Sequence, residues 1–205
     1  MSTATLPRPS SAATAFTVPR WKRWTVKEFH QLWGQGWFDH CRPALLEGKI
    51  LEMPNPGPLH NMSTTLADYR LKSVFTTGFV VRVQMPLVLS LWTDPIPDIA
   101  VVRGSPFDYA DNPTTADLVV EVSDSSLATD LGEKAALYAA AGIADYWVVD
   151  LINRCLVVHR DPQPDPTAPS QSKYRQVKTL SEASSCQPLV APSASVMVSD
   201  LLPRP

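Results

Sequence analysis

Two short apolar runs in the middle of the chain carry the clearest structural signal. PDIAVV (97–102) and DLVVEV (117–122) are β-branched and nearly continuous, which is typical of strands that are buried on both faces of a sheet. LGEKAALYAAAG (131–142) is rich in Ala and Leu and ends at a glycine, as a helix does. Two further strands are predicted at 145–150 and 155–160. The order strand, strand, helix, strand predicts an α/β core with a mixed sheet.

Shorter elements of both kinds are predicted on either side of this core. The spacing of Thr25 and Glu28 predicts a capping box, which opens a helix that ends near Gly34 or Gly36. A tight β-hairpin is expected around Glu47-Gly48-Lys49. The remaining predictions are a helix from Pro58 to about Phe75, strands at 79–83, 86–91 and 173–180, a proline-rich connector at 161–170, and a strand or short helix at 195–202.

Composition indicates one globular domain, which we place at residues 21–205, after a disordered tail at 1–20 that is rich in Ser, Thr, Ala and Pro. No apolar run approaches the roughly 18 residues that a membrane span needs, so no membrane segment is predicted. Three cysteines without a CxxC pair favour a reducing compartment, and we expect the protein to be cytoplasmic. The 18 Lys and Arg residues are outnumbered by 20 Asp and Glu residues, which excludes a protein that coats nucleic acid through a strongly basic surface.

Each of the two central strands contains a carboxylate among apolar residues. Asp98 lies in the first strand, and Glu121 lies well inside the second. Burying an unpaired carboxylate costs several kcal/mol or forces its protonation, and two neighbouring carboxylates also repel each other. A hard divalent cation such as Mg²⁺ relieves both problems, because it binds oxygen and commonly takes one or two carboxylates with water. Period-two alternation places Glu121 on the same face as Val119 and Ser123.

Lys134 is the third candidate group. It flanks the apolar stripe of the predicted helix and lies in its expected first turn, where a positive charge opposes the helix dipole. Proximity to Asp98 and Glu121 would explain a lysine in this place. Less specific interpretations remain open. In these, Lys134 pairs with Asp130 at i,i+4 on a solvated surface, Glu121 pairs with an arginine such as Arg103, and Asp98 accepts hydrogen bonds from turn amides.

Five segments occur in one order along the chain: TVKEF, LLEGKILEMPNPGPLH, PDIAVV, DLVVEVSDSS and EKAALYAAAGIADYWVVD. Together they resemble the Uma-type family of restriction-endonuclease-like bacterial proteins, in the PD-(D/E)XK nuclease superfamily, over about two thirds of the chain from Trp24 to Arg160. Asp98 and the preceding proline match the superfamily's Pro-Asp, and Glu121 matches its second acid. Ser123 stands where the superfamily usually has its lysine, and Lys134 matches a lysine of the following helix that takes that part in the family.

The same segments contain one further departure and one further candidate. The family tends to have a glutamate before its hairpin, where this chain has Ala44, and nearby Glu47 is the candidate replacement. His60 lies within the matched segments, at the start of the predicted second helix. It is a candidate for contacting a phosphate, and the alternative is a helix-capping or hydrogen-bonding histidine.

The resemblance implies a restriction-endonuclease-like α/β fold, with a mixed central sheet flanked by helices, and a metal-dependent endonuclease that acts on DNA as a homodimer. It further implies that Asp98, Glu121 and the Val122 carbonyl hold Mg²⁺ or Mn²⁺. Lys134 would then orient the attacking water or stabilise the transition state. One alternative is a catalytically weak or inactive member that acts as a binding or regulatory module, which Ala44 and the negative net charge favour. Another is hydrolysis of a different phosphoester.

Overall fold

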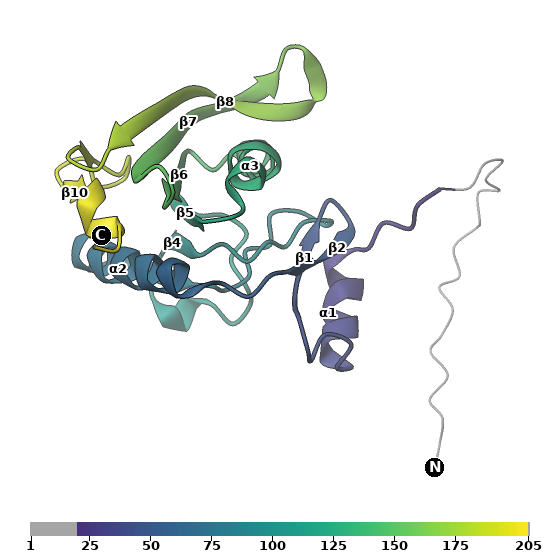
Figure 1. Ribbon diagram of the computed structural model, residues 1–205. Helices are drawn as coiled ribbons and strands as arrows, with labels where there is room; N and C mark the ends of the chain where they lie inside the picture. Colours follow the sequence, from purple (N-terminus) through teal and green to yellow (C-terminus); the bar gives the residue numbers. More distant parts are fainter. Residues whose placement is uncertain (1–19, 205) are drawn as a thin grey trace.

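A mixed sheet of six strands forms the centre of the protein (Figure 1). The computed structural model describes residues 20–204, so residues 1–19 of the predicted disordered tail lie outside the described residues. The strands follow one another in the sheet in chain order: β3 (Phe79–Val83), β4 (Ile99–Arg103), β5 (Leu118–Ser123), β6 (Asp145–Asp150), β7 (Cys155–Asp165) and β8 (Ala168–Ser181). β5 and β6 are parallel, whereas the other neighbouring strands are antiparallel. The predicted mixed sheet is confirmed.

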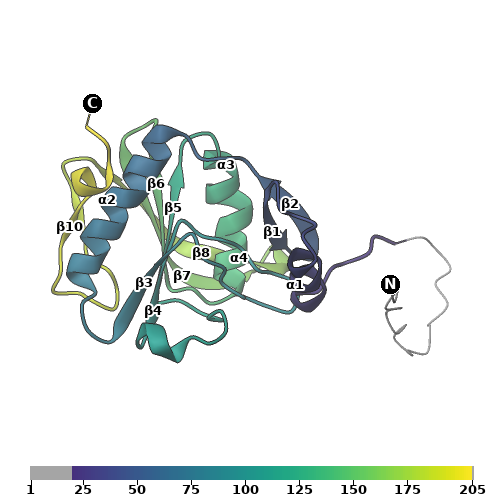
Figure 2. The ribbon, with the colours of Figure 1, turned by 90° about the horizontal axis from the view of Figure 1, so that it is seen from below.

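Helices cover both faces of this sheet, and Figure 2 shows them on either side of β5. One face packs against α2 (Pro58–Val74) and the C-terminal 3₁₀ helix η3 (Val198–Leu201). The other face packs against a helical segment made of α3 (Leu127–Thr129), the π-helical turn η2 (Asp130–Lys134) and α4 (Ala135–Ala140). None of the helices in the described part of the chain is long and apolar enough to span a bilayer.

Alternate residues of β5 belong to the two different cores. Leu118, Val120 and Val122 pack in the core on the α2 side, whereas Val119 packs in the core on the α4 side. This is the alternation that the sequence predicts for a strand with two buried faces. It directs Glu121 towards the helical segment that contains Lys134.

The N-terminal part forms a helix and a separate hairpin beside the sheet (Figure 1). α1 (Val26–Gly34) begins with the predicted capping box, in which Thr25 and Glu28 satisfy each other's backbone N–H groups. β1 (Arg42–Leu46) and β2 (Lys49–Met53) form the predicted hairpin. Its two turn residues, Glu47 and Gly48, both have positive φ angles (50° and 82°), as a type I′ turn requires. The remaining short elements are η1 (Pro106–Asp108), β9 (Ser185–Cys186) and β10 (Val196–Met197).

The strand predicted at 86–91 is wrong. Residues 86–91 belong to a loop between β3 and β4, in which the backbone N–H groups of Leu87 and Val88 bond to other loop residues instead of a neighbouring strand. Leu87 donates to the Pro95 carbonyl (3.0 Å), and Val88 donates to the Pro113 carbonyl (2.9 Å). Prolines in and after the apolar run lack the N–H group that a strand needs to extend its ladder. The apolar residues of the segment, such as Leu87 and Leu89, therefore pack against the core from a loop.

The predicted connector at 161–170 is also wrong, because β7 and β8 continue through it as a long hairpin. Pro162 pairs with Tyr174 and Pro164 with Ser172. The pairing of β6 with β7 ends at Arg160, so the prolines lie where β7 pairs with β8 alone. Proline is tolerated in a strand where no ladder bond is needed on one side.

The helical segment before β6 starts earlier than predicted, at Leu127. Lys134 therefore lies about two turns from its N-terminus, and the predicted conflict with the helix dipole does not arise. Residues 195–202 combine both predicted alternatives, because the short strand β10 is followed directly by η3.

Asp145 joins the C-terminal segment to the sheet. Its fully buried carboxylate accepts hydrogen bonds from the Arg160 guanidinium (2.8 and 3.2 Å), the Trp147 indole N–H (2.8 Å) and the Leu189 backbone N–H (2.9 Å). These donors come from β7, from β6 itself and from the segment after β9. One carboxylate thus fixes three parts of the chain relative to one another.

We predict that Asp145→Ala lowers the free energy of unfolding by roughly 3–5 kcal/mol, because it leaves the mostly buried Arg160 without its partner. Chemical denaturation followed by tryptophan fluorescence measures the loss. Asp165→Ala is the control, because Asp165 pairs with the exposed Lys173 and its removal costs much less. Equal losses in the two variants would contradict the role given to Asp145.

Candidate active site

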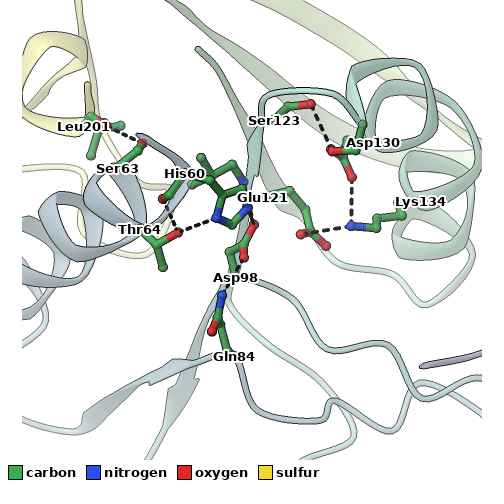
Figure 3. Close-up of polar contacts among 12 residues, drawn as sticks. His60, Ser63, Thr64, Gln84, Asp98, Glu121, Ser123, Asp130, Lys134 and Leu201 are labelled. Carbon is green, nitrogen blue, oxygen red and sulfur yellow. Dashed lines mark hydrogen bonds and ion pairs between the residues drawn. The ribbon is translucent and has the colours of Figure 1, made fainter. Parts of the chain in front are cut away.

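The register of the sheet brings Asp98 and Glu121 together. β4 and β5 pair Ile99 with Val120 in an antiparallel ladder, so the next position along each strand places Asp98 beside Glu121. Figure 3 shows both carboxylates between His60, from α2, and Lys134, from the π-helical turn. All four side chains line one cleft of about 490 Å³.

Asp98 is nearly buried and is held by donors from three elements. Its Oδ2 accepts a hydrogen bond from the Val122 backbone N–H at 2.9 Å and lies 3.1 Å from His60 Nε2, and its Oδ1 accepts from Gln84 Nε2 at 3.3 Å. Burial alone would raise the pKa of Asp98, but the His60 and Val122 donors outweigh it and hold the pKa below its ordinary value. Asp98 is therefore ionised at neutral pH. Its amide donor comes from the neighbouring strand and not from a turn.

Glu121 is almost completely buried in β5. The Tyr138 hydroxyl donates to its Oε1 at 2.7 Å, and Lys134 Nζ lies 3.1 Å from its Oε2. Burial raises the pKa of Glu121 to about 7, to which the charges of Asp98 and Asp130 contribute, while Lys134 and Tyr138 act against them. Burial is the larger effect, so Glu121 is partly protonated near neutral pH.

Lys134 is shared between two carboxylates. Besides Glu121, its Nζ contacts Asp130 Oδ1 at 2.8 Å, and Asp130 Oδ2 accepts a hydrogen bond from the Ser126 hydroxyl. Burial would lower the pKa of Lys134, but the two carboxylates raise it above its ordinary value, so the side chain stays an ammonium. The Asp130 and Glu121 contacts, which the sequence presented as alternatives, occur together. Both Asp130 and Lys134 belong to the π-helical turn, a conformation that is frequent at functional sites.

His60 completes the set from the first turn of α2. Its Nε2 faces Asp98, and its Nδ1 lies 3.4 Å from Thr64 Oγ1, which in turn donates to the His60 carbonyl at 2.9 Å. The Asp98 contact raises the pKa of His60, which favours the imidazolium with both nitrogens as donors. Because both ring nitrogens are engaged, the geometry favours the hydrogen-bonding role over direct contact with a phosphate.

The β1–β2 hairpin forms another wall of the cleft, through Arg42, Leu51, Glu52 and Met53. Glu47, predicted as a catalytic residue, lies instead in the exposed turn of this hairpin and does not line the cleft. Its backbone contacts Arg23 and Thr93. The structure thus brings the other predicted site residues into one cleft, namely Asp98, Glu121, Val122 and Lys134, and leaves Glu47 outside it.

Several members of this site were not predicted from the sequence. Tyr138 was not singled out, although a tyrosine four residues after Lys134 lies on the same helical face and can reach the same acid. Glu52 follows the hairpin turn and gave no local signal. Arg103, considered as a partner of Glu121, instead pairs with Asp117 at 3.0 Å.

Comparison with known proteins shows the family and the fold of the chain. The Uma2 family model, described as "Putative restriction endonuclease", matches residues 26–196. The chain belongs to the Uma2 family. One similar solved structure is that of a "putative nuclease belonging to DUF820" from Anabaena variabilis, with a TM-score of 0.62 and 15% identity, covering 86% of this chain and 96% of that chain. At this identity the likeness shows the fold, and the predicted restriction-endonuclease-like fold is confirmed. A search of curated proteins finds no match.

The cleft of this Uma2 member fits a divalent cation by its charge. Five carboxylates line it: those of Glu52, Asp98, Glu121, Asp124 and Glu133. Within residues 20–204, no three His, Cys, Asp or Glu side chains are grouped so that they could hold a metal ion by themselves. Mg²⁺ commonly takes only one or two carboxylates and keeps several waters, so Asp98 and Glu121 are candidate ligands even without a third such group. A cation bound beside Glu121 would favour its ionised form, against the burial that raises its pKa.

The pKa of Glu121 predicts a pH-dependent stability. Its folded-state value of about 7 lies above the ordinary 4.5, so the folded protein binds this proton more tightly than the unfolded chain. The resulting stabilisation is complete below pH 4.5 and is lost as pH rises through 7. We expect the free energy of unfolding to fall over this window by at most about 1.4 kcal/mol per pH unit, the slope for one proton.

Urea denaturation at a series of pH values gives the free energy of unfolding against pH. The slope of this dependence should be flatter in Glu121→Gln than in wild type. Glu52→Gln, an exposed acid of the same cleft, is the matched control and should keep it. His60, whose pKa is also raised, adds a slope of the same sign above pH 6.5 that remains in both variants. Identical slopes in wild type and Glu121→Gln would contradict the protonation assigned to Glu121.

Proposed function

We propose that the protein is a metal-dependent endonuclease that hydrolyses phosphodiester bonds in DNA. The observation that carries this proposal is the position of Lys134 Nζ, 3.1 Å from Glu121 in the cleft that also contains Asp98. Family membership and the nuclease fold support it. Two acids and an ammonium around one solvent-accessible cleft supply the groups that a metal-assisted attack on a phosphodiester needs.

Asp98, Glu121 and the Val122 backbone carbonyl would hold Mg²⁺ or Mn²⁺. When bound, the cation would polarise the phosphodiester and lower the pKa of a bound water. Asp98 is prepared for this role, because it is ionised and its carboxylate is fixed against β5 by the Val122 N–H. Glu121 is partly protonated at neutral pH, because its pKa is about 7. It would release this proton when the cation binds.

Lys134 would act as a charged donor and not as a base. Its pKa lies above the ordinary value, so the ammonium keeps its proton at neutral pH and can donate to a water or to phosphate oxygens. Ser123, in the place of the superfamily's usual lysine, is fully buried with its Oγ 3.4 Å from that of Ser126. The ammonium of this site therefore comes from the helical segment and not from β5.

We predict that Mg²⁺ or Mn²⁺ supports nicking of supercoiled plasmid, and that Asp98→Asn and Lys134→Met each lower the rate by at least about 100-fold. Gel analysis of nicked product against time gives the rates. Glu47→Gln should cleave at the wild-type rate, because Glu47 lies outside the cleft. Thermal unfolding of each variant shows whether a loss reflects chemistry or folding, which matters most for the buried Lys134.

The same experiment separates the enzyme from a non-catalytic binding module. Trace cleavage that is equal in wild type, Asp98→Asn and Lys134→Met would indicate contamination and would overturn the nuclease proposal. Retained binding of labelled DNA under those conditions would then support the binding module. Replacement of the plasmid by an RNA of equal length tests the choice of DNA as substrate.

Asp130 is a positioning residue in this mechanism, because it acts through Lys134. We predict that Asp130→Asn lowers kcat about tenfold with KM nearly unchanged, since one of the two contacts that orient the ammonium is weakened. Nicking rates over a series of plasmid concentrations give kcat and KM for wild type and Asp130→Asn. A loss that appears in KM with kcat unchanged would contradict the positioning role of Asp130.

We further propose that the enzyme acts in the cytoplasm as a homodimer. Cutting both strands of a duplex at one place needs two active sites, which two copies would provide. The three cysteines are free thiols, as is usual in a reducing compartment. Light scattering of the purified protein measures the number of copies.

A further inference from the structure

Arg42 of β1 is a cation of the cleft that the mechanism does not use. It lines the cleft of about 490 Å³ that contains the acids and Lys134. It also lines a second cavity of about 370 Å³, whose other residues are His40, Cys41, Glu52, Met53, Pro54 and Asn55. The two cavities share five lining residues, Arg42, Glu52, Met53, Pro54 and Asn55, so they adjoin and form one groove. Arg42 lies where the two cavities meet.

The hairpin register orients Arg42 towards this groove. Arg42 pairs with Met53 and Ala44 pairs with Leu51, so these four residues share one face of the hairpin. Arg42, Leu51 and Met53 of this face all line the cleft that contains the acids, and Glu52 of the opposite face lines it as well. Ala44 leaves the space beside Leu51 without a charged group. Arg42 is therefore the charged side chain that this face of β1 directs towards the cleft.

The guanidinium of Arg42 has no protein partner. Within residues 20–204 it forms no hydrogen bond and no ion pair, although five carboxylates line the same cleft and Arg42 is partly buried. The guanidinium lines the same cleft as His60, Asp98 and Glu121. An arginine presents five donors in a planar fork, which suits two oxygens of one phosphate.

We propose that Arg42 binds a backbone phosphate adjacent to the one that is cleaved, and that the joined cavities receive the strand on that side. This inference rests on the proposed nuclease function. The acids of the cleft repel a polyanion, so the strand needs a cation at each phosphate that it brings close to them. Lys134 supplies one at the reacting phosphate, and Arg42 supplies the next along the groove. The contact is to the backbone and is independent of base sequence.

The test measures the fluorescence anisotropy of a fluorescein-labelled DNA duplex as protein is added. The buffer contains Ca²⁺, and the titration is repeated at a series of KCl concentrations. Arg42→Gln should weaken binding about tenfold and lower the slope of log Kd against log[KCl] by about one, the value for one phosphate contact. Arg42→Lys should restore most of the slope, because it keeps the charge. Arg175→Gln is the matched control, because Arg175 lies on β8, pairs with Asp161 and lines neither cavity. It should leave both quantities unchanged.

The outcomes distinguish this inference from the proposed function. If the wild-type protein cleaves and binds DNA while Arg42→Gln shows the same Kd and the same salt slope, Arg42 has no phosphate contact and the nuclease proposal stands. If the wild-type protein neither binds nor cleaves DNA, both proposals are wrong. Inorganic phosphate is the competitor that separates the two possible sources of the anion. Displacement of DNA by micromolar phosphate, lost in Arg42→Gln, would replace the strand contact by a site for free phosphate.

Discussion

Three buried carboxylates contact the Lys134 ammonium and the His60 imidazole beside the cleft near the end of β5. Asp98, Glu121 and Asp130 are each more than nine-tenths buried, and they face His60 and Lys134. In such surroundings an unpaired charge costs far more than at the surface, so each group depends on the others being in place. The partners come from α2, from the strands β4 and β5, and from the π-helical turn. The compensation of charge therefore fixes the helices on both faces relative to the sheet at the same point where it forms the site.

This constraint explains which parts of the site were predictable from the sequence. A carboxylate inside a buried apolar strand is a local anomaly, so Asp98 and Glu121 were visible without a structure. Period-two alternation grouped Glu121 with Val119 on one face of β5, and the structure has Val119 in the core opposite to that of Val120 and Val122. Lys134 was identified by its place on the helix flank and by the family resemblance, although the argument from the helix dipole was wrong. The core strands were predictable from their continuous apolar runs, and the core helix from an Ala- and Leu-rich run that ends at a glycine.

The parts that could not be predicted depend on contacts between segments that are distant in sequence. The β1–β2 hairpin belongs to a sheet of its own, and its position is set by backbone bonds such as those between Leu45 and Asp94. That position decides that Glu52 lines the cleft and Glu47 does not. The hairpin sequence alone does not distinguish the two glutamates. The ion pair of His60 with Asp98 likewise needs α2 to pack against β4 and β5. Local pattern shows that a hairpin or helix forms, but not which end of it meets the acids.

Because the ammonium comes from a helix, the site depends on how that helix packs against the sheet. A lysine on β5 itself would not create this dependence. Lys134 reaches Glu121 only while the helical segment stays packed on the sheet. Two buried hydroxyls contribute to that packing: Tyr138 donates to the Glu121 carboxylate, and Tyr146 of β6 donates to the Asp130 backbone carbonyl at 2.8 Å. Both bonds join the helical segment to the sheet within the polar cluster itself. Loosening this segment would therefore move the ammonium away from Glu121 and raise the pKa of Glu121 further, because Lys134 and Tyr138 both lower it, which makes helix packing part of the chemistry of the site.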